Sequence, residues 1–182
     1  MNATLAETFW SGLSVSRTQR VAAILLGTLA LAISAQVKVP FWPVPMTMQT
    51  FVVLMIGAAF GAHMAAATVV AYLIEGTIGL PVFANAAGLA GPTAGYLVGF
   101  LVAATVMGWL ADRGHGRSIL TTFIAFLIGD AIMLAMGAGW LATKVGFEQA
   151  LSVGVIPFLP AEGVKIALAC ALLPMLWRVA RR

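Results

Sequence analysis

Charged residues are scarce in this sequence. Only 9% of its 182 residues are Asp, Glu, Lys or Arg, whereas 62% are hydrophobic, and a soluble domain usually carries charge at about a quarter of its positions. A chain with so few charges has no means of covering a folded surface with polar groups, so most of that surface must face lipid. The composition therefore excludes an ordinary soluble domain and predicts an integral membrane protein.

Several chemical signatures are missing as well. The single cysteine, Cys170, lies in an apolar run, so it has no partner in the chain for a disulfide or a cysteine metal cluster. The sequence holds no P-loop, His-Glu-x-x-His or Gly-x-Ser-x-Gly motif, which leaves no candidate for ATP hydrolysis, zinc catalysis or a serine nucleophile. The ten basic residues are scattered, and no nucleic-acid partner, metal or cofactor is predicted.

Apolar runs recur along the chain with a length suited to crossing a bilayer, which takes about 20 residues in a helix. We expect one all-α transmembrane domain over residues 1–182, a bundle of six transmembrane helices. The predicted spans are residues 18–37, 46–60, 64–78, 93–111, 118–138 and 160–177. Segments 38–45, 79–92 and 139–159 are predicted interfacial loops, the first two being rich in Pro or Gly.

Basic residues at the ends of these spans predict the orientation. With the N-terminus inside, seven arginines fall on the cytoplasmic side and two lysines on the outer side. The inner group is Arg17, Arg20, Arg113, Arg117, Arg178, Arg181 and Arg182, and the outer group is Lys38 and Lys144. Because basic residues accumulate on the cytoplasmic side, both termini are predicted to be cytoplasmic. The Pro/Gly-rich loops, and with them any binding site, are then expected at the outer face.

Four charged residues lie within or at the ends of the predicted spans: Glu75, Asp130, Glu162 and Lys165. Each is unfavourable in a membrane by about 2.5–3.5 kcal/mol on insertion scales. Glu162 and Lys165 are three residues apart and share a helix face. The charges either pair within the chain, or they form a polar ligand site in which Lys165 receives an anionic group and Asp130 accepts ligand N–H groups.

Other polar and small residues extend these alternatives. Gln49, Asn85 and Tyr96 lie in or beside the outer loops and can donate and accept hydrogen bonds. Small residues recur in the first span, a pattern that allows close helix approach and suits internal packing and docking of another subunit equally well. They are Ala23, Gly27, Ala30 and Ser34.

Five segments resemble the BioY family, the biotin-specific substrate-binding (S) components of energy-coupling-factor (ECF) transporters. They are PVPMTMQT at residues 43–50, GLPVFA at 79–84, GPTAGYLVGF at 91–100, IGD at 128–130 and FLPAEGVK at 158–165. The resemblance covers nearly the whole chain from about residue 20.

This resemblance implies a six-helix S component of the bacterial cytoplasmic membrane that binds biotin from outside. A transmembrane coupling subunit and two ATPase subunits would supply the energy for uptake. The resemblance leaves open whether the chain also forms a homo-oligomer. It assigns Gln49, Asn85, Tyr96, Asp130 and Lys165 to the biotin site. Trp42, Phe83, Glu75 and Glu162 are further candidates, the aromatic ones for packing the biotin ring.

Two positions depart from the family pattern. The usual Pro-Gly-Asp before the last lysine reads Pro-Ala-Glu162, which lengthens the acid, and the Gly-Gly after Pro-Val-Phe-Ala reads Asn85-Ala-Ala-Gly. Two other classes are alternatives: a membrane-embedded enzyme using Asp130, Glu162 and Lys165 as acid and base, and a purely structural subunit. Tight, saturable biotin binding without turnover distinguishes the transporter from both.

Overall fold

The chain folds into long apolar helices, as the composition predicts. The computed structural model describes residues 5, 8 and 16–180. Its helices are α2 (Arg17–Gln36), α3 (Gln49–Thr77), α4 (Ala94–Asp112), α5 (Ile119–Val145), α6 (Phe147–Gly154) and α7 (Leu159–Ala180), with a short 3₁₀ helix η1 (Gly88–Ala90). By length and composition, α2, α3, α4, α5 and α7 could each cross a membrane. Ser16 and Ser118 begin α2 and α5 with capping boxes, which satisfy the first free backbone N–H groups.

Helix α3 folds back on itself at Gly61. That glycine has φ 74° and ψ 173°, which a residue with a Cβ rarely adopts. The Gln49 side chain nevertheless donates a 2.7 Å hydrogen bond to the Tyr72 hydroxyl, although a straight helix would hold these residues about 35 Å apart. Residues 49–60 and 62–77 are therefore two limbs of a helical hairpin. The turn lies at Gly61, in the gap between the predicted spans 46–60 and 64–78, because the break needs a positive φ.

A Gly61→Ala variant is expected to lose about 1–3 kcal/mol of stability, because a Cβ strains this conformation. Thermal unfolding in detergent measures the loss. Gly163→Ala is the matched control: Gly163 lies in a regular helix and a Cβ there meets no described atom within 4 Å, so that alanine should leave stability equal or raise it. A Gly61→Ala protein as stable as the control would contradict the assigned break.

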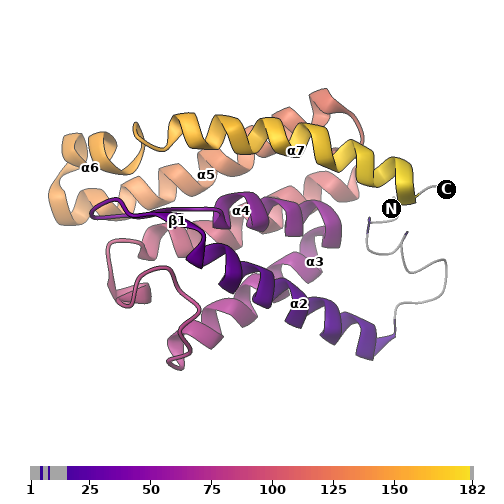
Figure 1. Cartoon of the computed structure of the whole chain (residues 1–182), viewed down its shortest axis with the longest axis horizontal. Coiled ribbons are helices and arrows are strands. Elements are labelled where there is room, and N and C mark those ends of the chain that lie inside the picture. Colours follow the sequence, from indigo (N-terminus) through magenta and orange to yellow (C-terminus); the bar gives the residue numbers. More distant parts are fainter. Residues whose placement is uncertain (1–4, 6–7, 9–15, 181–182) are drawn as a thin grey trace.

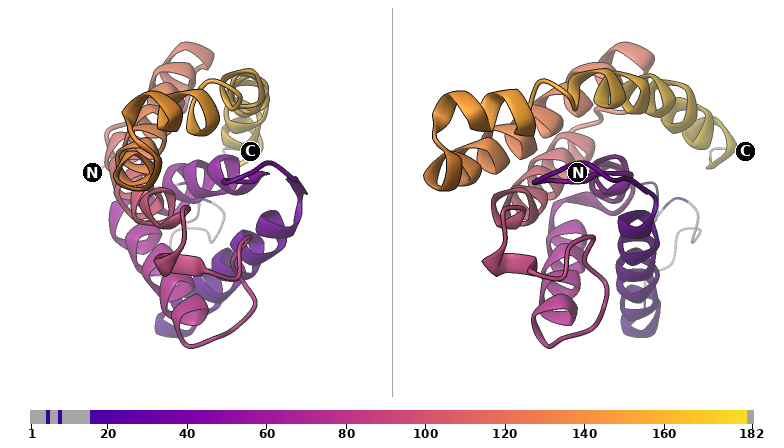
Figure 2. Two further views of the ribbon diagram at one scale, coloured as in Figure 1. Left: turned by 90° about the vertical axis from the view of Figure 1, so that its left-hand side faces the viewer. Right: turned by 60° about the vertical axis from the view of Figure 1, so that its left-hand side comes forward.

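The connections from α2 to α3, from α3 to α4 and from α5 to α7 gather at one end of the bundle, on the left in Figure 1. There β1 (Lys38–Val39) and β2 (Met46–Thr47) form a small antiparallel hairpin. The Lys38 ammonium donates to the Ala84 carbonyl at 2.9 Å, and the Trp140 indole donates to the Gly91 carbonyl at 3.0 Å. Seen from that end, α6 lies between the ends of α5 and α7 (Figure 2). The start of α2 and the end of α7 lie at the opposite end (Figure 1).

Some predicted boundaries were wrong. Segment 38–45 is not a plain loop but contains β1, and α3 begins at Gln49 because Met46 and Thr47 pair with β1. Segment 139–159 is mostly helical: α5 continues to Val145, where Gly146 with φ 87° ends it, and α6 follows. Gly139 adopts helical geometry, so it does not end the helix. Arg181 and Arg182, used in the predicted charge count, lie outside the described residues.

The predicted docking stripe on α2 mostly faces inward. Ala23, Gly27 and Ser34 are buried, and a Cβ on Gly27 would lie 2.5 Å from the Thr68 methyl group in the second limb of α3. These residues therefore serve internal packing, which is a correction to their proposed docking role. Ala30 alone of the four is exposed, because the buried face of α2 is centred nearer Leu31.

Candidate ligand-binding site

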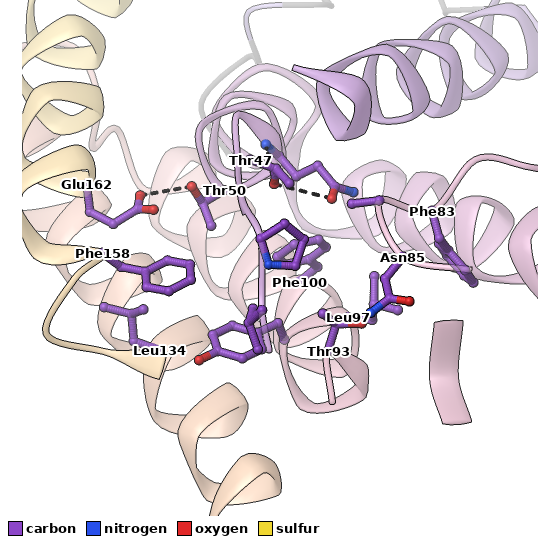
Figure 3. A pocket seen from close by; sticks show the side chains of 15 residues that line it. Thr47, Thr50, Phe83, Asn85, Thr93, Leu97, Phe100, Leu134, Phe158 and Glu162 are labelled. Atoms are coloured by element: carbon purple, nitrogen blue, oxygen red, sulfur yellow. Dashed lines mark hydrogen bonds between the residues drawn. The ribbon is translucent and has the colours of Figure 1, made fainter. Parts of the chain in front are cut away.

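A pocket opens at the end where the loops gather, between the β hairpin, α3, α4 and α7. The space between these elements measures about 510 Å³, including the part open to the outside. Figure 3 shows Glu162, Phe158 and Leu134 on one side and Phe83 and Asn85 on the other. The lining residues are Val44, Pro45, Thr47, Gln49, Thr50, Phe83, Ala84, Asn85, Thr93, Tyr96, Leu97, Phe100, Leu134, Phe158 and Glu162.

Hydrogen bonds hold the Phe83 side of the pocket. Gln49 donates to the Tyr72 hydroxyl, which donates in turn to the Val82 carbonyl at 2.9 Å. The Phe83 ring packs edge-on against Tyr72, with the ring centroids 5.4 Å apart. Gln49 thus acts mainly as a brace between α3 and the segment carrying Phe83 and Asn85. The Asn85 side-chain oxygen accepts from the Ala87 N–H at 3.0 Å, an arrangement that leaves the amide hydrogens as donors for the pocket.

Tyr96 and Phe158 form the opposite, aromatic side. Their rings stack at 6.1 Å with an interplanar angle of 16°. The Tyr96 hydroxyl donates to the Gly154 carbonyl at 2.5 Å. Because this bond satisfies the hydroxyl group's single donor, Tyr96 offers the pocket a ring face.

A buried ion pair lies behind the pocket. Lys165 Nζ donates to Glu162 Oε1 at 2.7 Å, to Thr50 Oγ1 at 2.8 Å and to the Thr47 carbonyl at 2.7 Å. Thr50 Oγ1 donates to Glu162 Oε2 at 2.8 Å. Glu162 and Lys165 are only 4% and 7% exposed, and the three ammonium donors are all used. The two residues therefore pair within the chain, while Glu162 also reaches the pocket wall.

The BioY family model matches residues 4–182. The chain belongs to the BioY family. It is 38% identical over 157 residues to a protein named biotin transporter BioY from Rhizobium etli, covering 79% of this chain and 83% of that one. It is 32% identical to a probable biotin transporter BioY from Pyrococcus horikoshii, covering 84% of this chain and 93% of the relative. These relatives confirm the resemblance seen in the motifs.

The fold also matches a solved structure. The crystal structure at 2.1 Å of the S-component for biotin from an ECF-type ABC transporter superposes with a TM-score of 0.74. The match covers 91% of this chain and 95% of that one, at 24% sequence identity. At this identity the likeness establishes the shared helical architecture.

Four predicted site residues of this BioY-family chain lie away from the pocket wall. Trp42 is 81% exposed at the tip of the β hairpin and borders a separate outer depression, because the β1–β2 pairing directs the tip outward. Glu75 is partly exposed on α3, outside the pocket lining. Asp130 is buried at a groove between α5 and α7. Lys165 lies behind Glu162 and Thr50.

Of the residues predicted from the sequence, Gln49, Phe83, Asn85, Tyr96 and Glu162 line the pocket. Other lining residues were not predicted, although two features of the sequence indicate some of them. Positions 96, 97 and 100 share a face of one helix, and Thr47, Thr50, Thr93 and Phe158 lie inside the family motifs. The missed residues include Thr47, Thr50, Thr93, Leu97, Phe100, Leu134 and Phe158.

Proposed function

We propose that this chain binds biotin from outside and serves as the substrate-specific S component of an ECF-type transporter of the bacterial cytoplasmic membrane. The observation that carries the proposal is the pocket itself: aromatic walls with an amide at one side and a carboxylate at the other. Biotin combines an apolar thioether ring, a polar ureido edge and a carboxylate tail, so its chemistry suits such a lining. The names of the BioY relatives support the same ligand.

This ligand suggests roles for several residues in and behind the pocket wall. The Glu162 carboxylate accepts the ureido N–H groups, while the Asn85 amide donates to a polar oxygen at the other end of biotin. Phe83, Tyr96 and Phe158 pack the ring. Lys165 acts through Glu162, whose negative charge it maintains. Gln49 braces the wall.

We also propose that each limb of α3 crosses the membrane, which gives six spans with both termini in the cytoplasm. The limbs are about 18 and 24 Å long at 1.5 Å per residue. Half of the apolar stretch of α3 is buried in protein, which lessens the need for the length of each limb to match the thickness of the bilayer. The charge distribution supports this orientation. Arg17, Arg20, Arg113, Arg117 and Arg178 belong to the end opposite the pocket, and Lys38 and Lys144 to the pocket end.

Energy for uptake is assigned to partner subunits: a transmembrane coupling protein and ATPases. The outward side of α2, where Leu25, Leu29 and Ile33 are more than half exposed, offers the coupling protein an apolar surface that includes Ala30.

An Ala30→Trp variant is expected to reduce ATP-dependent biotin uptake about tenfold or more by obstructing this contact, with biotin affinity unchanged. Ala67→Trp, on an exposed position of α3, is the control; equal uptake by the two variants would remove Ala30 from the docking surface.

Equilibrium binding of radiolabelled biotin to the purified protein in detergent tests the ligand. We expect saturable, tight binding and unchanged biotin after elution. Desthiobiotin, which keeps the ureido group, should compete, whereas an analogue alkylated on both ureido nitrogens should not, because it lacks the donors for Glu162. Absence of saturable binding would overturn the proposed function, and chemical conversion of biotin would favour an enzyme.

A further inference from the structure

Asp130 is a buried acid whose hydrogen bonding is incomplete. Its side chain, in α5, is 5% exposed, and its buried Oδ1 has no hydrogen-bond partner among the described residues. A buried polar atom without a partner is unfavourable and is rare in folded proteins. Asp130 does not line the biotin pocket, so contact with the ligand does not account for its position. It borders the groove between α5 and α7, which Glu162 also lines.

The charges around Asp130 do not balance. Asp130 and Glu162 line the same groove, and the cation of this cluster, Lys165, is bonded to Glu162. Both groups belong to α7. Thr50 of α3, which joins the same cluster, does not titrate, and Cys170 lies farther along the groove. Lys165 already uses its three donors, one of them on Glu162. Two ionised carboxylates would therefore leave one excess negative charge in a poorly solvated site.

A proton resolves both the charge and the hydrogen bonding. A protonated carboxyl group is a donor, and Glu162, which lines the same groove, is an acceptor of suitable charge. Glu162 is the better candidate for the ionised member of the pair, because Lys165 and Thr50 both donate to it. Carboxyl groups that share a site commonly hold one proton between them for the same reason.

We propose that Asp130 is a positioning residue that carries a proton and donates it in a hydrogen bond to Glu162, thereby holding the Glu162 carboxylate at the wall of the biotin pocket. The inference rests on the proposed function, since biotin is the ligand that reports the position of Glu162. Asp130 borders the groove between α5 and α7, and Glu162 lines both that groove and the biotin pocket. A substitution at Asp130 therefore changes biotin binding through Glu162, without direct contact with the ligand.

The pH dependence of biotin binding tests this inference with wild type, Asp130→Asn and Asp130→Ala. Affinity is measured from about pH 6 to about pH 9, a range in which ordinary carboxyl groups stay ionised and lysines stay charged. Wild-type affinity should fall about tenfold or more toward pH 9, because loss of the proton leaves two adjacent negative charges. Asn keeps the shape and a donor but does not titrate. It should restore at pH 6 most of the affinity that Ala loses, and its profile should be flat.

Two results would overturn the inference: a flat wild-type profile, or an Asn variant as weak as Ala at pH 6. The first would mean that no proton is lost in this range, and the second that Asp130 is needed as an anion. Thermal unfolding separates these outcomes from a failure of the proposed function. If wild type binds no biotin at any pH, its melting temperature should still fall toward pH 9 while that of Asp130→Asn does not, and a parallel fall in both would reject the proton on Asp130.

Discussion

A Lys165→Met variant is expected to lose biotin binding by a factor of about 100 or more. Met fills similar space but removes the ammonium group that donates to Glu162, Thr50 and Thr47. Glu162 is then a buried acid without a cation, and breaking a buried ion pair in this way costs about 3–5 kcal/mol. The acid takes up a proton instead, so it no longer accepts both ureido N–H groups. Equilibrium biotin binding and thermal unfolding in detergent measure the two effects.

A control and a double variant separate charge balance from ligand binding. Lys144→Met removes an exposed lysine beside Trp140 and should change neither property. Glu162→Gln combined with Lys165→Met removes both charges. It should recover much of the stability lost by Lys165→Met while leaving biotin affinity low, because no carboxylate faces the pocket. Affinity of Lys165→Met within about threefold of wild type would show that the ion pair has no part in binding.

The membrane class and most helices could be predicted because hydropathy accumulates over about 20 residues. Helix ends depended on individual glycines, which are harder to interpret. Gly61 breaks α3 and Gly146 ends α5 with positive φ angles, whereas Gly139 stays helical. Sequence alone does not separate these cases, because tertiary packing decides which glycine adopts the unusual conformation. The close approach of Gly108 on α4 to the Gly61 turn is one such constraint.

The candidate site was predictable where the signal was local. The three-residue spacing of Glu162 and Lys165 indicated one helix face, and the structure pairs them. Their bonds to Thr50 and Thr47 join residues more than 110 positions apart, which no local pattern reveals. Trp42 was misplaced for a related reason: an aromatic residue in a proline-rich loop suits a pocket wall or a membrane interface, and only the hairpin pairing directs it outward.

A Gly137→Ala variant is expected to weaken biotin binding about 10- to 100-fold. Gly137 of α5 lies against the ring of Tyr96, and a Cβ there would approach the ring atoms more closely than real side chains tolerate. The ring is also held by its stacking on Phe158 and by its hydrogen bond to Gly154, so the added methyl group must push it toward the pocket or separate α4 from α5. Overpacking of this kind costs about 1–3 kcal/mol, and here the strain falls on a wall of the ligand site.

Gly139→Ala is a matched control two residues along the same helix. Gly139 is exposed, and a Cβ there meets none of the described atoms within 4 Å. Both substitutions raise helix propensity by a similar amount, so a difference in affinity reports the Tyr96 contact. Isothermal titration with biotin gives that difference, and thermal unfolding shows whether Gly137→Ala stays folded. Equal affinities in two folded variants would mean that the position of the Tyr96 ring does not govern binding, and the aromatic wall would then have to be assigned to Phe83 and Phe158 alone.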